Sequence, residues 1–229
     1  MSRARPALLA IAAAYVDTCG FIGLFGLFTA HVTGNFVLIG AELVNRHVDI
    51  LTKSLALPVF IASVLLANQA EVVMRRRGMA ATTWLLGVQS LLIALAALAP
   101  GWTGLPRQPD DMPSVVIGFV LITAIGVQNA LMRTSLAGPV QTTVMTGNVT
   151  QLTIDLLALA TGRAEGGTRT RAAALWPVVI AFAAGSALGA AGYAGLGFHC
   201  LWLASALTAG AAWFTRRLEA KETSERSAI

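Results

Sequence analysis

The chain has 229 residues, of which 56% are hydrophobic and only 12% are charged. A typical soluble domain is about 45–50% apolar and about 25% charged, so this composition excludes a soluble globular domain and also a disordered chain. The net charge of +5 does not indicate a nucleic-acid partner, because the basic residues lie between apolar segments. The remaining class is an integral membrane protein, with room for about six spans of about 20 residues.

Six segments are long enough to cross a bilayer. The first follows a basic N-terminus, and because Asp17 interrupts its apolar run we interpret it as a retained span rather than a signal peptide. Residues 75–78 (Arg-Arg-Arg-Gly) end the second span, and residues 195–197 (Gly-Leu-Gly) separate the last two. The predicted spans are residues 8–28, 54–74, 80–99, 114–133, 172–193 and 196–214.

Two further apolar segments, 34–44 and 147–160, are short; at 1.5 Å per residue the first covers only ~16 Å of a ~30 Å hydrocarbon core. If neither crosses and the N-terminus is cytoplasmic, 13 of the 16 basic residues lie inside, and only Arg46, Lys53 and Arg107 lie outside. This distribution predicts a multi-pass protein of the cell inner membrane, with six spans, both termini in the cytoplasm and two half-helices that do not cross.

An internal repeat divides the chain. Residues 29–35 (Thr-Ala-His-Val-Thr-Gly-Asn) recur 113 positions later as residues 142–148 (Thr-Thr-Val-Met-Thr-Gly-Asn). Two halves, residues 1–105 and 106–229, each hold three predicted spans, so the second half enters the membrane from the opposite side. The predicted fold is an all-α membrane protein with a 3+3 inverted-topology repeat, an arrangement typical of transporters and channels.

The repeated Thr-Gly-Asn predicts the start of a re-entrant or broken half-helix. Thr33 suits an N-cap, Gly34 permits a sharp turn, and Asn35 offers donors and an acceptor; Thr146, Gly147 and Asn148 match them. If both turns lie near the membrane midplane, the partial positive charges of two helix N-termini favour a polar or anionic ligand there. The alternative is that both segments lie on the membrane surface and the motif is only a cap.

Several polar residues inside or beside the spans are candidate site residues. Asp17 is costly in a span, so it pairs with a cation, carries a proton or hydrogen-bonds a neighbouring helix; Arg133 is a candidate partner. Glu42 and Asp155 follow the two asparagines by seven residues, where a solvated interfacial role and ion binding are both open. The predicted substrate-binding residues are Asp17, His31, Thr33, Gly34, Asn35, Gln128, Asn129, Thr146, Gly147 and Asn148, and the candidates for ion coupling are Asp17, Glu42 and Asp155.

Two signatures resemble a known family. Residues 15–17 (Tyr-Val-Asp) followed by residues 28–35 resemble the first signature of the bacterial YoaK family, and residues 126–130 followed by 142–148 resemble the second. The resemblance covers nearly the whole chain. It implies a polytopic inner-membrane protein of about six helices but no activity, because the family is a domain of unknown function.

These patterns favour a secondary transporter or channel for a small polar or anionic solute, with proton coupling as an open point. A membrane enzyme, suggested by Gly185-Ser186 and His199, and a non-transporting accessory or scaffold subunit are the alternatives. We expect no enzymatic activity, no cofactor and no metal, because the phosphate-binding and metal-ligand spacings are missing. The expected partners are the lipid bilayer and a small polar solute or ion. The small-residue stripe Ala181, Gly185, Gly189 predicts close helix packing within the bundle or in a homodimer.

Overall fold

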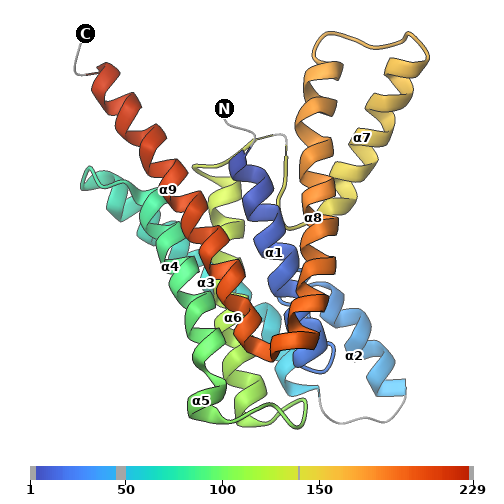
Figure 1. Ribbon diagram of the computed structural model, residues 1–229, viewed down its shortest axis with the longest axis vertical. Helices are drawn as coiled ribbons and strands as arrows, with labels where there is room; N and C mark the ends of the chain where they lie inside the picture. Colours follow the sequence, from blue (N-terminus) through green and yellow to red (C-terminus); the bar gives the residue numbers. More distant parts are fainter. Residues whose placement is uncertain (1–3, 45–49, 139, 227–229) are drawn as a thin grey trace.

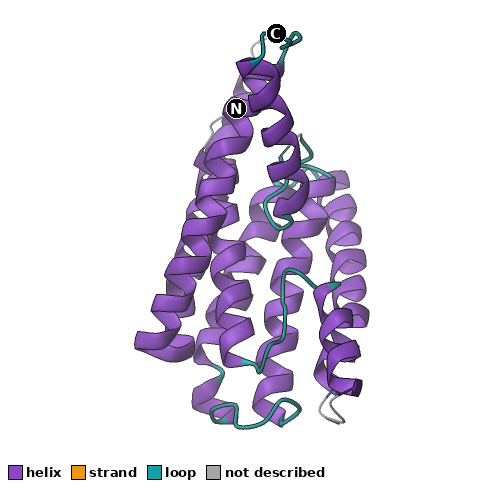
Figure 2. Cartoon of the chain, turned by 90° about the vertical axis from the view of Figure 1, so that its right-hand side faces the viewer, coloured by secondary structure: helices purple, strands orange, loops and turns teal. Residues whose placement is uncertain are grey.

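The computed structural model describes residues 4–44, 50–138 and 140–226, and within these ranges the chain is helical with no strand (Figure 2). The helices lie roughly along one axis, so the described chain is a bundle (Figure 1). Their bounds are α1 Ala4–Gly23, α2 Gly34–Val44, α3 Leu51–Arg76, α4 Ala81–Leu98, α5 Pro100–Thr103, α6 Met112–Arg133, α7 Met145–Ala160, α8 Thr168–Leu196, the 3₁₀ helix η1 Gly197–Cys200, and α9 Leu201–Arg226.

Five helical stretches are long and apolar enough to cross a membrane. They are Ala4–Gly23, Leu51–Arg76, Ala81–Thr103, Met112–Arg133 and Thr168–Ala220. The last contains both α8 and most of α9, and the chain reverses direction between them at η1 (Figure 1). Gly197 makes this reversal with φ +55, a left-handed conformation that glycine adopts without steric cost. The architecture is therefore an all-helical bundle compatible with a membrane.

Predicted boundaries differ from the structure at several helix ends, including those of α1, α7 and α8. α1 ends at Gly23 rather than at residue 28, because Phe25 (φ 55) and Gly26 (φ 83) turn the chain out of the helix. α7 begins at Met145, two residues before the predicted start. α8 begins at Thr168, four residues before the predicted span, directly after Gly167 in a left-handed conformation.

Glycines allow α1 and α8 to pack closely. A Cβ on Gly185 would lie 2.5 Å from the carbonyl oxygen of Ile11, and one on Gly189 would lie 2.8 Å from that of Tyr15. Real Cβ atoms do not approach backbone so closely, so each position requires glycine. The stripe of small residues thus packs inside the bundle, where close backbone approach replaces the hydrophobic drive that lipid does not supply.

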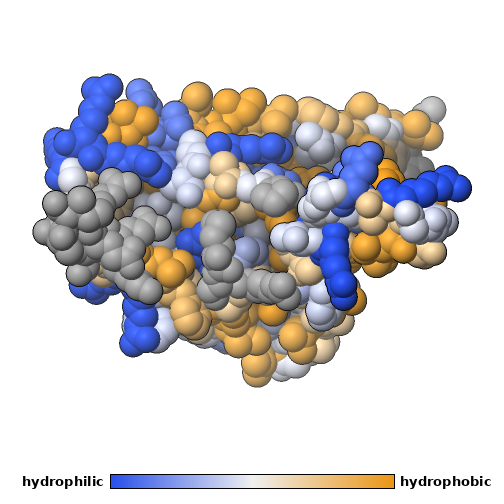
Figure 3. Space-filling model, turned by 90° about the horizontal axis from the view of Figure 1, so that it is seen from above, coloured by the Kyte–Doolittle hydropathy of each residue, from blue (hydrophilic) through white to orange (hydrophobic). Residues whose placement is uncertain are grey.

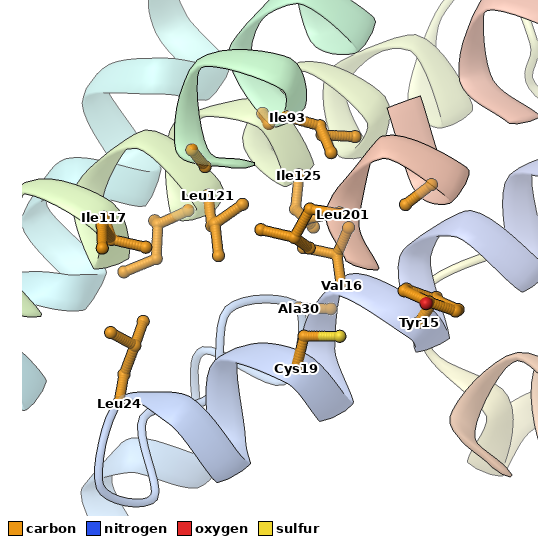
Figure 4. Packing of buried hydrophobic residues seen from close by; sticks show 14 of the residues in the cluster. Tyr15, Val16, Cys19, Leu24, Ala30, Ile93, Ile117, Leu121, Ile125 and Leu201 are labelled. Atoms are coloured by element: carbon orange, nitrogen blue, oxygen red, sulfur yellow. The ribbon is translucent and has the colours of Figure 1, made fainter. Parts of the chain in front are cut away.

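The apolar core forms where α1, α4, α6 and α9 meet (Figure 4). Side chains from α6, including Leu121 and Ile125, pack with Val16 of α1 and Leu201 of α9. Cys19 lies in this core as a free thiol, with its Sγ 3.3 Å from the Sγ of Cys200. The core therefore joins the first helix of the chain to the last.

Both described ends of the chain lie at one end of the bundle (Figure 1). Helices α3, α6 and α9 finish there and α4 and α8 begin there, which brings Arg75–Arg77, Arg133 and Arg216 to the same end. Lys53 and Arg107 lie at the opposite end, near the start of α3 and in the loop before α6. Figure 3 shows the molecule from the end that holds both termini, where hydrophilic residues lie next to hydrophobic residues on the sides of the bundle.

Candidate functional site at the two Thr-Gly-Asn turns

The two short helices begin about halfway along the bundle and run to opposite ends (Figure 1). α2 leads towards the end that holds α5 and packs on α3, whereas α7 leads towards the end that holds both termini and packs on α8. Irregular segments, residues 24–33 in the first half and residues 134–138 and 140–144 in the second, lead to these starting points. Both Thr-Gly-Asn motifs therefore lie in the middle region of the bundle.

Asn35 and Asn148 make the same pair of hydrogen bonds in the two halves. The Asn35 side chain accepts from the backbone N–H of Phe28 at 2.9 Å and donates to its carbonyl oxygen at 2.9 Å. Asn148 accepts from the N–H of Gln141 at 3.2 Å and donates to its carbonyl oxygen at 2.6 Å. Each asparagine thus holds the backbone seven residues before it, and its amide is already used within the protein. Contact of either asparagine with a solute stays a prediction.

Asp17 holds the segment that leads into α2. Its Oδ1 accepts hydrogen bonds from the backbone N–H groups of Thr29 and Ala30, each at 2.7 Å, and from the Thr29 hydroxyl at 3.2 Å. Its Oδ2 lies 2.7 Å from Nδ1 of His31. The Asp17 side chain is only 8% exposed, so these bonds replace the water that its carboxylate loses. Of the roles open for Asp17, the structure shows a hydrogen-bonded pair with His31 rather than with Arg133.

Asn129 takes the place of Asp17 in the second half. Its Oδ1 accepts from the hydroxyl of Thr143, which corresponds to Ala30 at the repeat offset of 113. Its Nδ2 donates to the carbonyl oxygen of Ile125 within α6. The neutral amide therefore binds the equivalent segment through fewer bonds than the carboxylate does.

Gln128 joins the second turn segment to two helices. Its Nε2 donates to the Thr142 hydroxyl at 2.7 Å and to the Leu9 carbonyl oxygen at 3.1 Å, while its Oε1 accepts from Nε2 of Gln89 at 2.6 Å. Gln128, Gln89 and Thr142 are all fully buried. Gln89 was not among the predicted site residues, because it has no counterpart in the repeated motif and only the fold brings α4 beside α6.

The acids that follow the motifs form ion pairs with the next long helix. Glu42 lies 2.9 Å from Nζ of Lys53, the third residue of α3. Asp155 accepts two bonds from Arg171, the fourth residue of α8, at 2.8 and 2.5 Å. Each pair ties the end of a half-helix to the start of the following helix. Ion coupling through Glu42 or Asp155 stays a prediction. The sequence signal that could have identified the two partners is the basic residue near the start of each following helix, Lys53 in α3 and Arg171 in α8.

The threonines of the two motifs differ in their place on the helix. α2 begins at Gly34 as predicted, and its first N–H groups bond to the carbonyl oxygens of His31, Val32 and Thr33. In α7 the N-cap residue is Val144, without a side-chain cap, so the predicted cap role of Thr146 is wrong: Thr146 is the second helical residue. The side chains of Thr33 and Thr146 are exposed, and so is Gly147.

One aromatic side chain lies beside both turns. The ring of Phe182 in α8 meets the His31 ring edge-on, with centroids 6.0 Å apart. Phe182 also packs against the apolar cluster that contains Val140 and Met145 from the second turn. The His31 side chain is 39% exposed. The two motifs thus approach the same part of α8, with a titratable side chain between carboxylate and aromatic ring.

Gly185 and His199, which suggested an enzyme, lie in different parts of the bundle. Gly185 packs against the backbone of α1 at Ile11, which accounts for its small size. His199 lies exposed in η1, at the turn between α8 and α9.

An all-helical bundle with membrane-length apolar helices, and with two short helices that are each tied to the preceding loop by a buried asparagine, is compatible with the class of polytopic helical membrane proteins. Its family follows from the sequence: the chain belongs to DUF1275, described as a protein of unknown function, and the match covers residues 6–214. This match is consistent with the resemblance to the YoaK family. No curated protein and no solved structure matches the chain.

Proposed function

We propose that this protein is a secondary transporter or channel for a small polar or anionic solute. The observation that carries the proposal is that Asn35 and Asn148 make equivalent hydrogen bonds in the two halves. In both halves a buried asparagine holds the backbone seven residues earlier, and the half-helix that follows starts in the middle of the bundle. Irregular backbone at membrane depth is tolerated only where it is buried in protein or lines a wet cavity.

An inverted repeat is the architecture that we propose for this function. The helix packing supports this repeat. Helix α1 packs on α8 and α9; correspondingly, its counterpart α6 packs on α3 and α4. At the contact of α4 with α9, the hydroxyls of Ser90 and Ser205 each donate to the other's carbonyl oxygen at 2.9 Å. Such reciprocal bonds are what an approximate two-fold axis between the halves produces.

The same architecture supports six crossings in a bacterial inner membrane. With the terminal end in the cytoplasm, the basic residues obey the positive-inside rule. Cysteine labelling checks this orientation in a background of Cys19→Ala and Cys200→Ala. We expect Arg107→Cys to react with a membrane-impermeant maleimide from outside and Arg76→Cys to react only after permeabilisation; the reverse result contradicts the proposed orientation.

The chemistry of the turns favours a polar or anionic solute. The exposed Thr146 and Gly147 lie in the first turn of α7, where the helix dipole is positive. From the other half, the partly exposed His31 and its buried partner Asp17 offer an imidazole–carboxylate pair that can hold a proton. This pair is where we place proton coupling.

The test is solute entry into proteoliposomes, followed by stopped-flow light scattering with nitrate, formate, glycerol and urea as probes. We expect at least one probe to enter faster than into protein-free vesicles, and an imposed pH gradient to change the rate of an anion. Asn35→Ala and Asn148→Ala should each lower the entry rate of the transported probe at least about tenfold, which corresponds to an increase of about 1.4 kcal/mol in the activation free energy of transport. Asn68→Ala, at an exposed site on α3, is the matched control and should leave it unchanged.

Two results contradict the proposal. One is that no probe enters faster than into protein-free vesicles at any pH gradient. The other is that both asparagine variants, shown by size-exclusion chromatography to be folded, transport as fast as the control.

A further inference from the structure

A groove of about 670 Å³ opens between α4 and α9, away from the two turns. Its hollow part is lined by the small residues Ala80, Gly87 and Ala212, and Trp84 and Trp213 lie on either side. A Cβ on Gly87 would meet no atom within 4 Å, so the hollow is open rather than filled by a neighbouring side chain.

The groove changes character along its length. At the terminal end of the bundle it is bordered by Thr83 and by the exposed Arg216. Farther along α4 it continues over Val88 and Leu91, and Leu91 lies about 10 Å from Trp84 along the helix axis. One end is therefore charged and the rest is apolar.

Among the side chains that the structure describes, those around the charged end of the groove carry a positive excess. Arg217 stacks on Trp213, with its guanidinium carbon 3.7 Å from the ring centroid, beside Arg216. The nearby carboxylate of Glu219 accepts a hydrogen bond from the Thr83 hydroxyl at 2.7 Å. Of the described side chains at this end, Arg216 and Arg217 thus stand against the Glu219 carboxylate, which already accepts a hydrogen bond from the protein.

We propose that this groove binds an anionic phospholipid. The phosphate lies at Arg216, and one acyl chain lies along Gly87, Val88 and Leu91. Tryptophans are favoured at the depth of lipid headgroups, and both Trp84 and Trp213 are about half exposed at the charged end. A basic residue at a membrane surface contributes about 1 kcal/mol towards an anionic lipid, which corresponds to about a fivefold preference. The site is independent of any transport activity.

Tryptophan quenching by brominated lipids tests the site. The reporter protein has Trp102, Trp176 and Trp202 replaced by Phe, so that only Trp84 and Trp213 fluoresce. It is reconstituted in phosphatidylcholine vesicles that contain a minor fraction of either dibrominated phosphatidylglycerol or dibrominated phosphatidylcholine. We expect about fivefold stronger apparent binding of the brominated phosphatidylglycerol, as read from the concentration that gives half-maximal quenching.

Two variants separate the parts of the site. Arg216→Gln should bring the preference close to one, whereas Arg169→Gln, an exposed arginine at the same end on α8, should preserve it. Gly87→Leu places its Cβ in open space and extends a side chain into the hollow, so it should reduce quenching by both brominated lipids. Gly195→Leu, where a Cβ also meets open space, is its matched control.

Three outcomes overturn the proposal. Equal quenching by the two lipids in the reporter protein means ordinary contact with surrounding lipid only. A preference that survives Arg216→Gln places the anionic lipid elsewhere. Quenching by neither lipid, with a dimer mass in detergent, means that a second copy of the chain covers the groove.

Discussion

Replacement of Asp17 tests whether its carboxylate holds the segment before α2. In Asp17→Ala the backbone N–H groups of Thr29 and Ala30 lose their acceptor, at positions that are 0% and 6% exposed. A buried donor left without a partner costs about 1–3 kcal/mol. The two N–H groups alone therefore predict a loss of about 2–6 kcal/mol in the free energy of unfolding.

Two further variants separate charge from hydrogen bonding. Asp17→Asn keeps an acceptor for Thr29 and Ala30 but loses the charge; since charged bonds contribute about 1.5–3 kcal/mol and neutral ones about 0.5–1.5 kcal/mol, we expect a loss of about 1–3 kcal/mol. Asn129→Ala removes the bond to the Thr143 hydroxyl and one bond within α6, and should cost about 1–2 kcal/mol. The expected order of destabilisation places Asp17→Ala first.

The assay is reversible unfolding in mixed micelles of increasing dodecyl sulfate content, followed by far-ultraviolet circular dichroism. Each 1.4 kcal/mol corresponds to about a tenfold change in the unfolding equilibrium constant at 25 °C. The reasoning is refuted if Asp17→Ala lies within about 0.5 kcal/mol of the unsubstituted protein, or if Asn129→Ala costs more than Asp17→Ala.

Two other predictions concern packing and pH. Gly189→Val places a Cβ about 2.8 Å from the Tyr15 carbonyl oxygen and should destabilise the protein by at least about 1–3 kcal/mol. Gly195→Val, whose Cβ meets open space, should leave the stability nearly unchanged, because valine has a slightly better helix propensity than glycine; equal melting temperatures of the two variants in detergent would show that α1 and α8 do not meet at Gly189. At the start of α3, burial raises the pKa of Asp110, but hydrogen bonds from the hydroxyl and N–H of Thr52 and the N–H of Leu51, with the charge of Lys53, outweigh it and lower the pKa below its ordinary value. The stability that Asp110 contributes is therefore present above its unfolded pKa of about 4 and is lost as pH falls through the folded pKa. Thermal melts between about pH 6 and pH 3 should show a steeper loss in the unsubstituted protein than in Asp110→Asn; parallel curves would contradict the role of Asp110.

The sequence predicted where in the chain the candidate site lies, but it did not predict the hydrogen bonds that the site residues make. The repeat of Thr-Gly-Asn at an offset of 113 identified Asn35 and Asn148 as equivalent. Their partners, the backbone groups of Phe28 and Gln141, depend on how each loop returns to the helix that follows it. The start of α7 at Met145 likewise depends on the preceding loop and not on the motif, so Thr146 did not take the cap position.

The sequence by itself determined the class of protein, the short helices and the grouping of basic residues, because hydropathy and charge are properties of each segment taken alone. Only the tertiary structure decided which polar groups meet. Asp17 reaches His31 because the chain turns back at Phe25 and Gly26, and Gln89 reaches Gln128 because α4 packs on α6. A charged fraction of 12% indicated a membrane protein. The tertiary structure showed that Glu42 and Asp155 form ion pairs with basic residues and that Asp17 is hydrogen-bonded to a loop. Such pairings depend on the path of the backbone, which no local pattern contains.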